Sequence, residues 1–167
     1  MQRELVVMRH AKSDWKSGAE TDHARPLNAR GRRDAPRVAA ALLAMECWPD
    51  AVWSSDARRT RETWAAMAAV GGDCPTHFDR ALYLADYGDV RGLAETWPAT
   101  LGRVLVLGHN PGWEAMVARL SGSWQELTTA NAVVLRGEGA TWSEALDGNW
   151  SRVHWIRPRE LHDEAQS

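Results

Sequence analysis

Five short apolar runs, separated by segments with helical spacing, constrain the fold of this chain more than any other feature. The runs are rich in valine, as expected of strands that are covered on both faces. Strands that alternate with helices form a mostly parallel sheet with a layer of helices on each side. We therefore predict a three-layer α/β/α sandwich. The predicted strands are Leu5–Met8, Ala51–Ser54, Val104–Leu107, Ala132–Arg136 and Val153–Ile156.

Four helices are predicted between these strands. In the first, apolar residues between Ala35 and Leu43 recur at helical spacing and form one face. Asn28 is a suitable N-cap for this helix, and Pro36 should kink it mildly. The other three helices are predicted at about Ala57–Ala69, at about Asp89–Trp97 and from Asn110 onward.

The last two predicted strands have no helical pattern between them, so we expect an antiparallel pair at one edge of the sheet. The helix before these strands opens with Asn110-Pro111-Gly112, where Asn110 is the expected N-cap and Pro111 lies in the first turn.

Size and charge narrow the class of protein. A chain of 167 residues suits one domain over residues 1–167, with a polar tail after Pro158 that we expect to fray. A net charge of -2 gives no general attraction to nucleic acid or to an anionic membrane. No leader segment and no apolar run of membrane-spanning length is visible. Cys47 and Cys74 lack metal-ligand spacing and are expected to be reduced thiols, which favours a cytoplasmic protein without a structural metal.

Residues that suit phosphate chemistry follow three of the predicted strands. Arg9 and His10 follow the first, an arginine-rich segment at 55–63 follows the second, and His109 follows the third. Ligands of open α/β sheets bind outside the carboxyl ends of the strands. Arginine binds phosphate oxygens bidentately, and histidine can accept a group covalently. Each residue alone has an ordinary explanation, such as solvation or a satisfied buried histidine, but together they predict a phosphate site.

Four motifs in this order resemble those of the histidine phosphatase superfamily, which has the phosphoglycerate mutase-like fold. Within that superfamily the chain is most similar to the short SixA-type phosphohistidine phosphatases, over roughly Leu5 to Pro158. The sequence departs from the family pattern at Ala11, Asp56 and Glu62, where Gly, Pro and Gln are common, and none of these changes removes a phosphate ligand. The four motifs are Met8–Asp14 (MRHAKSD), Arg25–Gly31 (RPLNARG), Ser55–Thr63 (SDARRTRET) and Gly108–Gly112 (GHNPG).

The resemblance implies that His10 is the nucleophile and that Arg9, Arg59 and His109 complete the phosphate pocket. The arginine of the third family motif lies four positions after the serine, which selects Arg59, with Arg58 as the competing register. Lys12 and Ser13, just beyond the nucleophile, are candidates for contact with phosphate or with a partner protein, and the alternative is that they are merely solvated.

A covalent phosphatase of this kind needs no cofactor and no metal, because arginine and histidine side chains can neutralise the phosphoryl oxygens. An alkyl phosphate benefits from a general acid, for which Asp86 is the best candidate and Asp89 the next. The interpretation that we favour is that Asp89 caps the following helix and Asp86 belongs to a turn. A phosphoramidate can release neutral imidazole after protonation by solvent, so a pocket without an acid suits phosphohistidine.

We therefore predict a phosphohistidine phosphatase that acts on phosphorylated proteins, such as phosphotransfer domains or phosphocarriers, through an intermediate on His10. A phosphatase for small phosphorylated metabolites is the second hypothesis. A non-catalytic phosphoprotein-binding module is the third, and the nucleophile argues against it. Neither a nucleic acid nor a membrane is expected as a partner.

Overall fold

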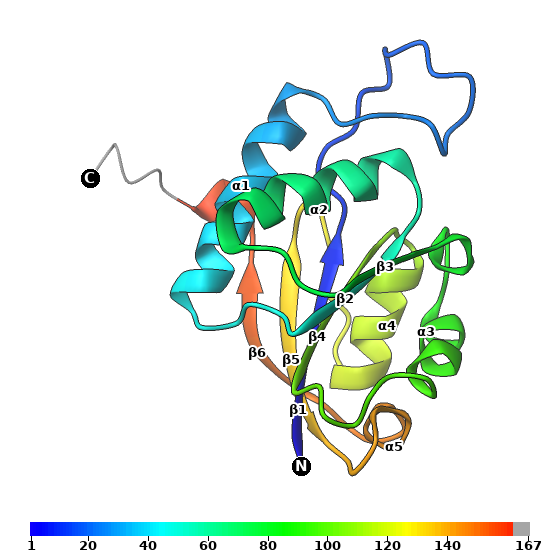
Figure 1. Cartoon of the computed structure of the whole chain (residues 1–167), viewed down its shortest axis with the longest axis vertical. Helices are drawn as coiled ribbons and strands as arrows, with labels where there is room; N and C mark the ends of the chain where they lie inside the picture. Colours follow the sequence, from blue (N-terminus) through cyan, green and yellow to red (C-terminus); the bar gives the residue numbers. More distant parts are fainter. Residues whose placement is uncertain (162–167) are drawn as a thin grey trace.

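The computed structural model describes residues 1–161, which form one six-stranded sheet between two layers of helices (Figure 1). Helices α1 and α2 lie against one face of the sheet, and α3, α4 and α5 lie on the other. The strands are β1 (Gln2–Arg9), β2 (Ala51–Ser55), β3 (Thr76–Asp79), β4 (Arg103–Gly108), β5 (Ala132–Glu138) and β6 (Ser151–Ile156). The α-helices are α1 (Ala29–Ala44), α2 (Arg58–Gly71), α3 (Tyr87–Ala94), α4 (Gly112–Ser121) and α5 (Trp142–Leu146).

The sheet is mostly parallel, as predicted. Its strand order is β3-β2-β4-β1-β5-β6. The first four strands in this order pair in parallel, whereas β5 pairs antiparallel with both β1 and β6. The antiparallel pairs therefore lie at one side of the sheet, and the carboxyl ends of β1, β2 and β4 meet at the same edge.

Strand β1 lies inside the sheet and is covered on both faces. Leu5 and Val7 pack into the core beneath α3, α4 and α5, whereas Val6 and Met8 pack into the core beneath α1 and α2. All four side chains are fully buried. Because successive side chains of a strand point to opposite faces, a strand buried on both faces has an uninterrupted apolar run.

Two elements of the structure were not predicted. Strand β3 lies at the edge of the sheet and has the sequence Thr-His-Phe-Asp, which is only partly buried and has no apolar run. Helix α5 lies between β5 and β6, where we expected no helix. It has only five residues, and the Thr141 side chain caps it by accepting a hydrogen bond from the Glu144 N–H. The expected direction of these strands is nevertheless confirmed.

Asn28 caps α1 as predicted, since its side-chain oxygen accepts a hydrogen bond of 2.9 Å from the Gly31 N–H. Helix α3 is present as predicted but begins two residues earlier and ends at Ala94, and the prediction that Asp89 caps it was wrong. Asp86 is its N-cap and accepts from the Asp89 N–H, while the Asp89 carboxylate accepts from the Asp86 N–H. The two carboxylates thus form a capping box, and neither lies in a separate turn.

Asn110 does not cap α4, contrary to the prediction. Its side-chain amide instead donates a hydrogen bond of 2.8 Å to the Leu127 carbonyl, and the helix begins at Gly112 after a cis Asn110–Pro111 peptide bond. The amide thereby ties the start of α4 to the segment that leads into β5.

Beyond β6, Pro158–Glu160 form a short 3₁₀ helix, and the Arg37 guanidinium donates to the Leu161 carbonyl. The rest of the tail that we expect to fray, residues 162–167, lies outside the described residues. No helix among residues 1–161 is long and apolar enough to span a membrane. Cys47 and Cys74 are both free thiols.

The contact between α1 and the segment after β1 leaves no room for a side chain at Gly31. A methyl group there would come within 2.1 Å of the Lys12 carbonyl oxygen. We expect Gly31→Ala to lower the free energy of unfolding by about 1–3 kcal/mol, as overpacking usually does. In α3, where nothing lies within 4 Å of the added methyl, Gly92→Ala should raise it by about 0.4–1 kcal/mol. Urea unfolding of both variants checks this, and equal effects would contradict it.

Candidate active site

Three segments that are distant in the sequence meet at the carboxyl edge of the sheet. His10 follows β1, Arg59 lies in the first turn of α2 after β2, and His109 follows β4. The two imidazole rings are 5.2 Å apart between centroids. The Arg59 guanidinium contacts both rings, with Nε 3.3 Å from Nε2 of His10 and Nη2 3.2 Å from Nδ1 of His109. The strand-end residues that we predicted therefore form one cluster.

His10 is held so that one ring nitrogen is free of a proton. Its Nδ1 lies 2.7 Å from the Ala11 carbonyl oxygen, which can only accept, so Nδ1 carries the proton. Nε2 consequently accepts the hydrogen bond from Arg59 and has a lone pair facing the cluster. The backbone of His10 is fixed by hydrogen bonds to Gly108 and Ala130. A neutral imidazole with a bare, directed nitrogen has the form that a nucleophile requires.

His109 has the opposite tautomer. Its Nδ1 accepts from Arg59, so its proton lies on Nε2 and is donated to the Ser55 hydroxyl at 2.8 Å. Burial, and next the positive charge of Arg59, lower the pKa of His109 to about 3. Burial also lowers the pKa of His10 well below its ordinary value, and the charges of Arg59 and Arg9 act in the same direction. Both imidazoles are therefore neutral near pH 7.

The structure places Arg59, and not Arg58, at the cluster. The Arg59 side chain is only 4% exposed, whereas Arg58 points to solvent and pairs with Glu62 along the helix at 2.8 Å. The register question that the sequence left open is thus answered by the burial and contacts of the Arg59 side chain.

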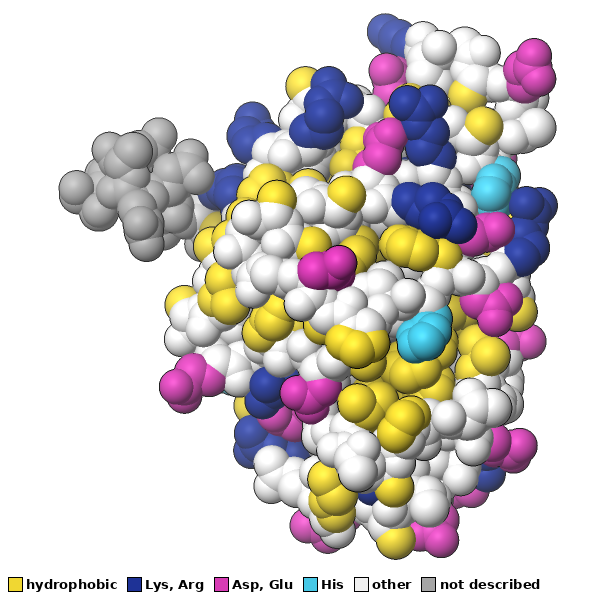
Figure 2. Space-filling view, viewed as in Figure 1, with side chains coloured by type: hydrophobic (Ala, Val, Ile, Leu, Met, Phe, Trp, Pro, Cys, Tyr) yellow, Lys and Arg dark blue, Asp and Glu magenta, His cyan; other side chains and the backbone are white. Residues whose placement is uncertain are grey.

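Arg9 adds a second positive charge to the same edge. Its Nη1 donates to the Leu127 carbonyl at 3.0 Å, and its Nε is buried without a protein partner. Its charge contributes to the lowered pKa of both imidazoles. Figure 2 shows Lys and Arg side chains gathered toward the end of the molecule where the loop after β1 projects.

Three other predicted residues lie outside this cluster. Lys12 is half-buried and Ser13 is buried, with the Ser13 backbone bridged to Leu27. Within residues 1–161, neither side chain is hydrogen-bonded to the two histidines or to Arg59. Asp86 is exposed, and its carboxylate is used as the cap of α3. The Asp86 carboxylate thus has a structural role at the start of α3, and its role as a general acid stays a prediction.

Sequence reasoning missed the partners of the cluster. The Asp22 carboxylate accepts from Arg59 at 3.0 Å and also from the Tyr83 hydroxyl. The Thr63 hydroxyl accepts from the Ala11 N–H at 3.1 Å and fixes the backbone beside the nucleophile. Thr63 and Ser55 are part of the arginine motif and could have been suspected. Asp22 and Tyr83 come from loops whose sequence carries no comparable signal.

Among residues 1–161, no group of three or more His, Cys, Asp or Glu side chains could hold a metal ion. The chemistry of the cluster is that of a cationic pocket with a directed imidazole, which suits a tetrahedral oxyanion.

Comparison with known proteins identifies the family of this chain. The family model of the histidine phosphatase superfamily, branch 1, matches residues 5–135. The chain belongs to this superfamily. It is also 34% identical to an uncharacterized chloroplastic protein of Arabidopsis thaliana, over 93% of this chain and 78% of that protein. The recognition based on the four motifs is thus confirmed.

Solved structures with the same fold include SixA proteins. A chain from Nakamurella multipartitia, named as a presumed phosphohistidine phosphatase SixA, has a TM-score of 0.83 and 27% identity over 95% of this chain and 97% of that one. The protein histidine phosphatase SixA complexed with tungstate has a TM-score of 0.79 and 20% identity over 93% of this chain and 97% of that one. The second likeness concerns the fold alone. The phosphoglycerate mutase-like fold that we predicted is confirmed.

The low pKa of His109 makes the stability of this histidine phosphatase superfamily member depend on pH. The unfolded chain binds a proton near pH 6.5, whereas folded His109 does not until about pH 3. Folding therefore becomes less favourable as the pH falls below 6.5, by about 2 kcal/mol at pH 5 from this residue alone. We expect His109→Asn to lose less stability than the wild type between pH 7 and pH 5 in urea unfolding. Equal losses would show that His109 titrates normally in the folded protein.

Proposed function

We propose that this protein is a phosphatase that hydrolyses phosphohistidine on phosphorylated proteins through a covalent intermediate on His10. The observation that carries the proposal is the geometry of the cluster, in which a bare Nε2 of His10 faces the guanidinium of Arg59 and Nδ1 of His109. A nucleophile and anion-binding donors are thus within reach of one tetrahedral group.

The reaction has two steps. Nε2 of His10 forms a bond to phosphorus while the bond from phosphorus to the substrate imidazole breaks, and that imidazole takes a proton from solvent. A water oxygen then bonds to phosphorus, the bond to Nε2 breaks, and His10 returns to its neutral form with inorganic phosphate as product. Arg9 and Arg59 neutralise the equatorial oxygens in both steps. His109 would donate to phosphate only if the bound phosphate raises its pKa and Nδ1 exchanges its hydrogen bond from Arg59 for one to a phosphoryl oxygen.

The side chains around the cluster indicate which kind of leaving group the site favours. Asp86 caps α3, and Asp22 is held in an ion pair with Arg59, so neither offers a proton to an alkoxide. Imidazole leaves as a neutral molecule after protonation by water, which makes a phosphoramidate the better substrate. The likeness to the Nakamurella multipartitia chain supports the same substrate class. The partner would be a phosphotransfer domain or a phosphocarrier protein, and two free thiols fit the cytoplasm.

The direct test is phosphate release from a phosphohistidine-bearing carrier protein. We expect His10→Ala to abolish release and Arg59→Ala to reduce kcat/KM by about a thousandfold, because each removes a group that acts only on the reacting phosphoryl group. Arg58→Ala is the matched control, one residue away on the same helix, and should stay within about twofold of the wild type, as expected for a solvated side chain. Activity that persists in His10→Ala would contradict the covalent mechanism.

Asp86→Asn distinguishes the alternative, a phosphatase for small phosphorylated metabolites. Asparagine caps helices as well as aspartate does, so the fold of α3 should be kept. We expect release of phosphate from both the carrier protein and an alkyl phosphate to change by less than about twofold, since Asp86 is already used as a cap. A large loss confined to the alkyl phosphate would identify Asp86 as a general acid and favour the metabolite phosphatase.

A further inference from the structure

The Arg59 guanidinium has two sets of partners, the imidazoles of the cluster and Asp22. One edge of the planar group, Nε and Nη2, faces the two imidazoles. The adjacent edge, Nη1 and Nη2, which shares Nη2 with the first edge, is bound by Asp22. The Asp22 backbone carbonyl accepts from Nη1 at 2.7 Å, and its carboxylate accepts from Nη2 at 3.0 Å.

We propose that Asp22 is the positioning residue for Arg59, holding one edge of the guanidinium so that the Nε–Nη2 edge is directed at the phosphate. The proposal rests on the proposed function only in that an oxyanion binds at the His10 and His109 cluster. A free arginine side chain has many rotamers, and fixing it costs entropy when the ligand binds. Because Asp22 binds Nη1 and Nη2 in the folded protein, the side chain of Arg59 is ordered on folding. Its Nε–Nη2 edge is then already oriented before the substrate binds.

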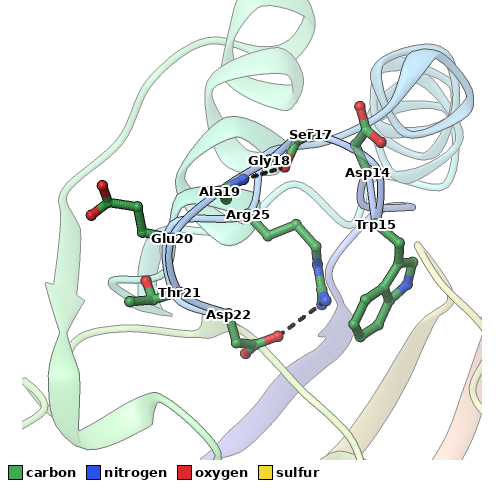
Figure 3. A pocket seen from close by; sticks show the side chains of 9 residues that line it. All are labelled: Asp14, Trp15, Ser17, Gly18, Ala19, Glu20, Thr21, Asp22 and Arg25. Atoms are coloured by element: carbon green, nitrogen blue, oxygen red, sulfur yellow. Dashed lines mark hydrogen bonds and ion pairs between the residues drawn. The ribbon is translucent and has the colours of Figure 1, made fainter.

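Asp22 can do this because its carboxylate is itself held by two further residues, Tyr83 and Arg25. Tyr83 lies just before α3, and its hydroxyl donates to the same Asp22 carboxylate oxygen that accepts from Arg59. Arg25 pairs with the other carboxylate oxygen at 3.1 Å. The Arg25 guanidinium in turn lies 3.4 Å from the centroid of the Trp15 ring. Figure 3 shows Arg25 between Trp15 and Asp22, on a loop that borders a cavity of about 270 Å³.

The same loop is also attached to the helix that carries Arg59. His23 contacts Asp56 at 2.7 Å through its Nε2, and the His23 carbonyl accepts from the Arg58 N–H at 3.0 Å. The distance between Asp22 and the start of α2 is thus set by the backbone as well as by the side chains. Burial raises the pKa of the Asp22 carboxyl, but the Tyr83 hydrogen bond and the charge of Arg59 outweigh it and leave the pKa below its ordinary value. The Asp22 carboxylate that holds Arg59 is therefore negatively charged at neutral pH.

A competing role would be that of an internal anion that occupies the phosphate position and blocks it. The geometry disfavours this role, because Asp22 holds Nη1 and shares Nη2 with His109, whereas Nε faces the nucleophile His10. The two roles predict opposite effects on oxyanion binding. Loss of a positioning residue weakens binding, whereas loss of a nearby competing negative charge strengthens it.

The experiment measures tungstate binding to the full chain by isothermal titration calorimetry at pH 7.5. We expect Asp22→Ala to weaken binding by roughly tenfold to a hundredfold, as is typical when a supporting partner is removed. Asp22→Asn keeps an acceptor oxygen toward Nη2 and should recover most of the affinity. Glu20→Ala is the control, since it removes one negative charge from the same exposed loop without touching Arg59.

Tighter binding of tungstate by Asp22→Ala, or an Asp22→Asn variant no better than Asp22→Ala, would overturn the proposal. A second measurement does not use the oxyanion at all. In NMR spectra of protein with labelled arginine, the Arg59 Nε–H should be protected from exchange in the wild type and in Asp22→Asn but not in Asp22→Ala. Equal protection in all three would likewise overturn it.

The two proposals fail separately. Tungstate binding and Nε–H protection do not require turnover, so a wild type that binds tungstate but leaves phosphohistidine intact would refute the proposed function and keep the role of Asp22. If the wild type hydrolyses phosphohistidine but Asp22→Ala binds tungstate as tightly as the wild type does, the role of Asp22 is refuted and the proposed function is kept. Thermal unfolding of each variant shows whether it is folded, and Tyr83→Phe, which removes one support of Asp22, should weaken tungstate binding by a smaller factor.

Discussion

The burial of β1 on both faces is the constraint on which the rest of the structure depends. Because Leu5 to Met8 are all buried between two layers of helices, the strand cannot shift or tilt without exposing apolar surface or creating a cavity. His10, the residue directly after β1, is therefore held at a defined place at the edge of the sheet. Parallel pairing with β4, whose end carries His109, then brings the second imidazole to the same edge.

Placing two imidazoles beside the buried Arg59 and the half-buried Arg9 has an electrostatic consequence. A positive imidazolium next to Arg9 and Arg59 would be repelled and poorly solvated, so both rings stay neutral. The pocket thus gathers positive charge on the arginines while it keeps a lone pair on His10. Asp22 offsets part of that charge on the far side of Arg59, where it does not face the nucleophile. Attraction for phosphate and nucleophilicity are in this way assigned to different side chains.

Much of the fold could be predicted because buried parallel strands have a plain pattern. All five predicted strands exist, and the Asn28 cap and the mixed direction of the sheet are as expected. The elements that were missed, β3 and α5, are short: the edge strand is only partly buried and has no apolar run, and five residues are too few to show a helical spacing. The cap of α3 was assigned to the wrong carboxylate, because Asp86 and Asp89 both suit a helix start and only the backbone distinguishes them.

By itself the sequence determined which residues follow the ends of β1, β2 and β4, and their chemistry indicated a phosphate site. It left open whether Arg58 or Arg59 faces that site, since both lie at a helix start and a rotation of one residue exchanges them. Only the tertiary structure decided for Arg59, by burying its guanidinium against the two imidazoles and leaving Arg58 exposed. It alone also brought Asp22 and Tyr83 to Arg59, because contacts between loops depend on how the layers pack and leave no periodic signal in the chain.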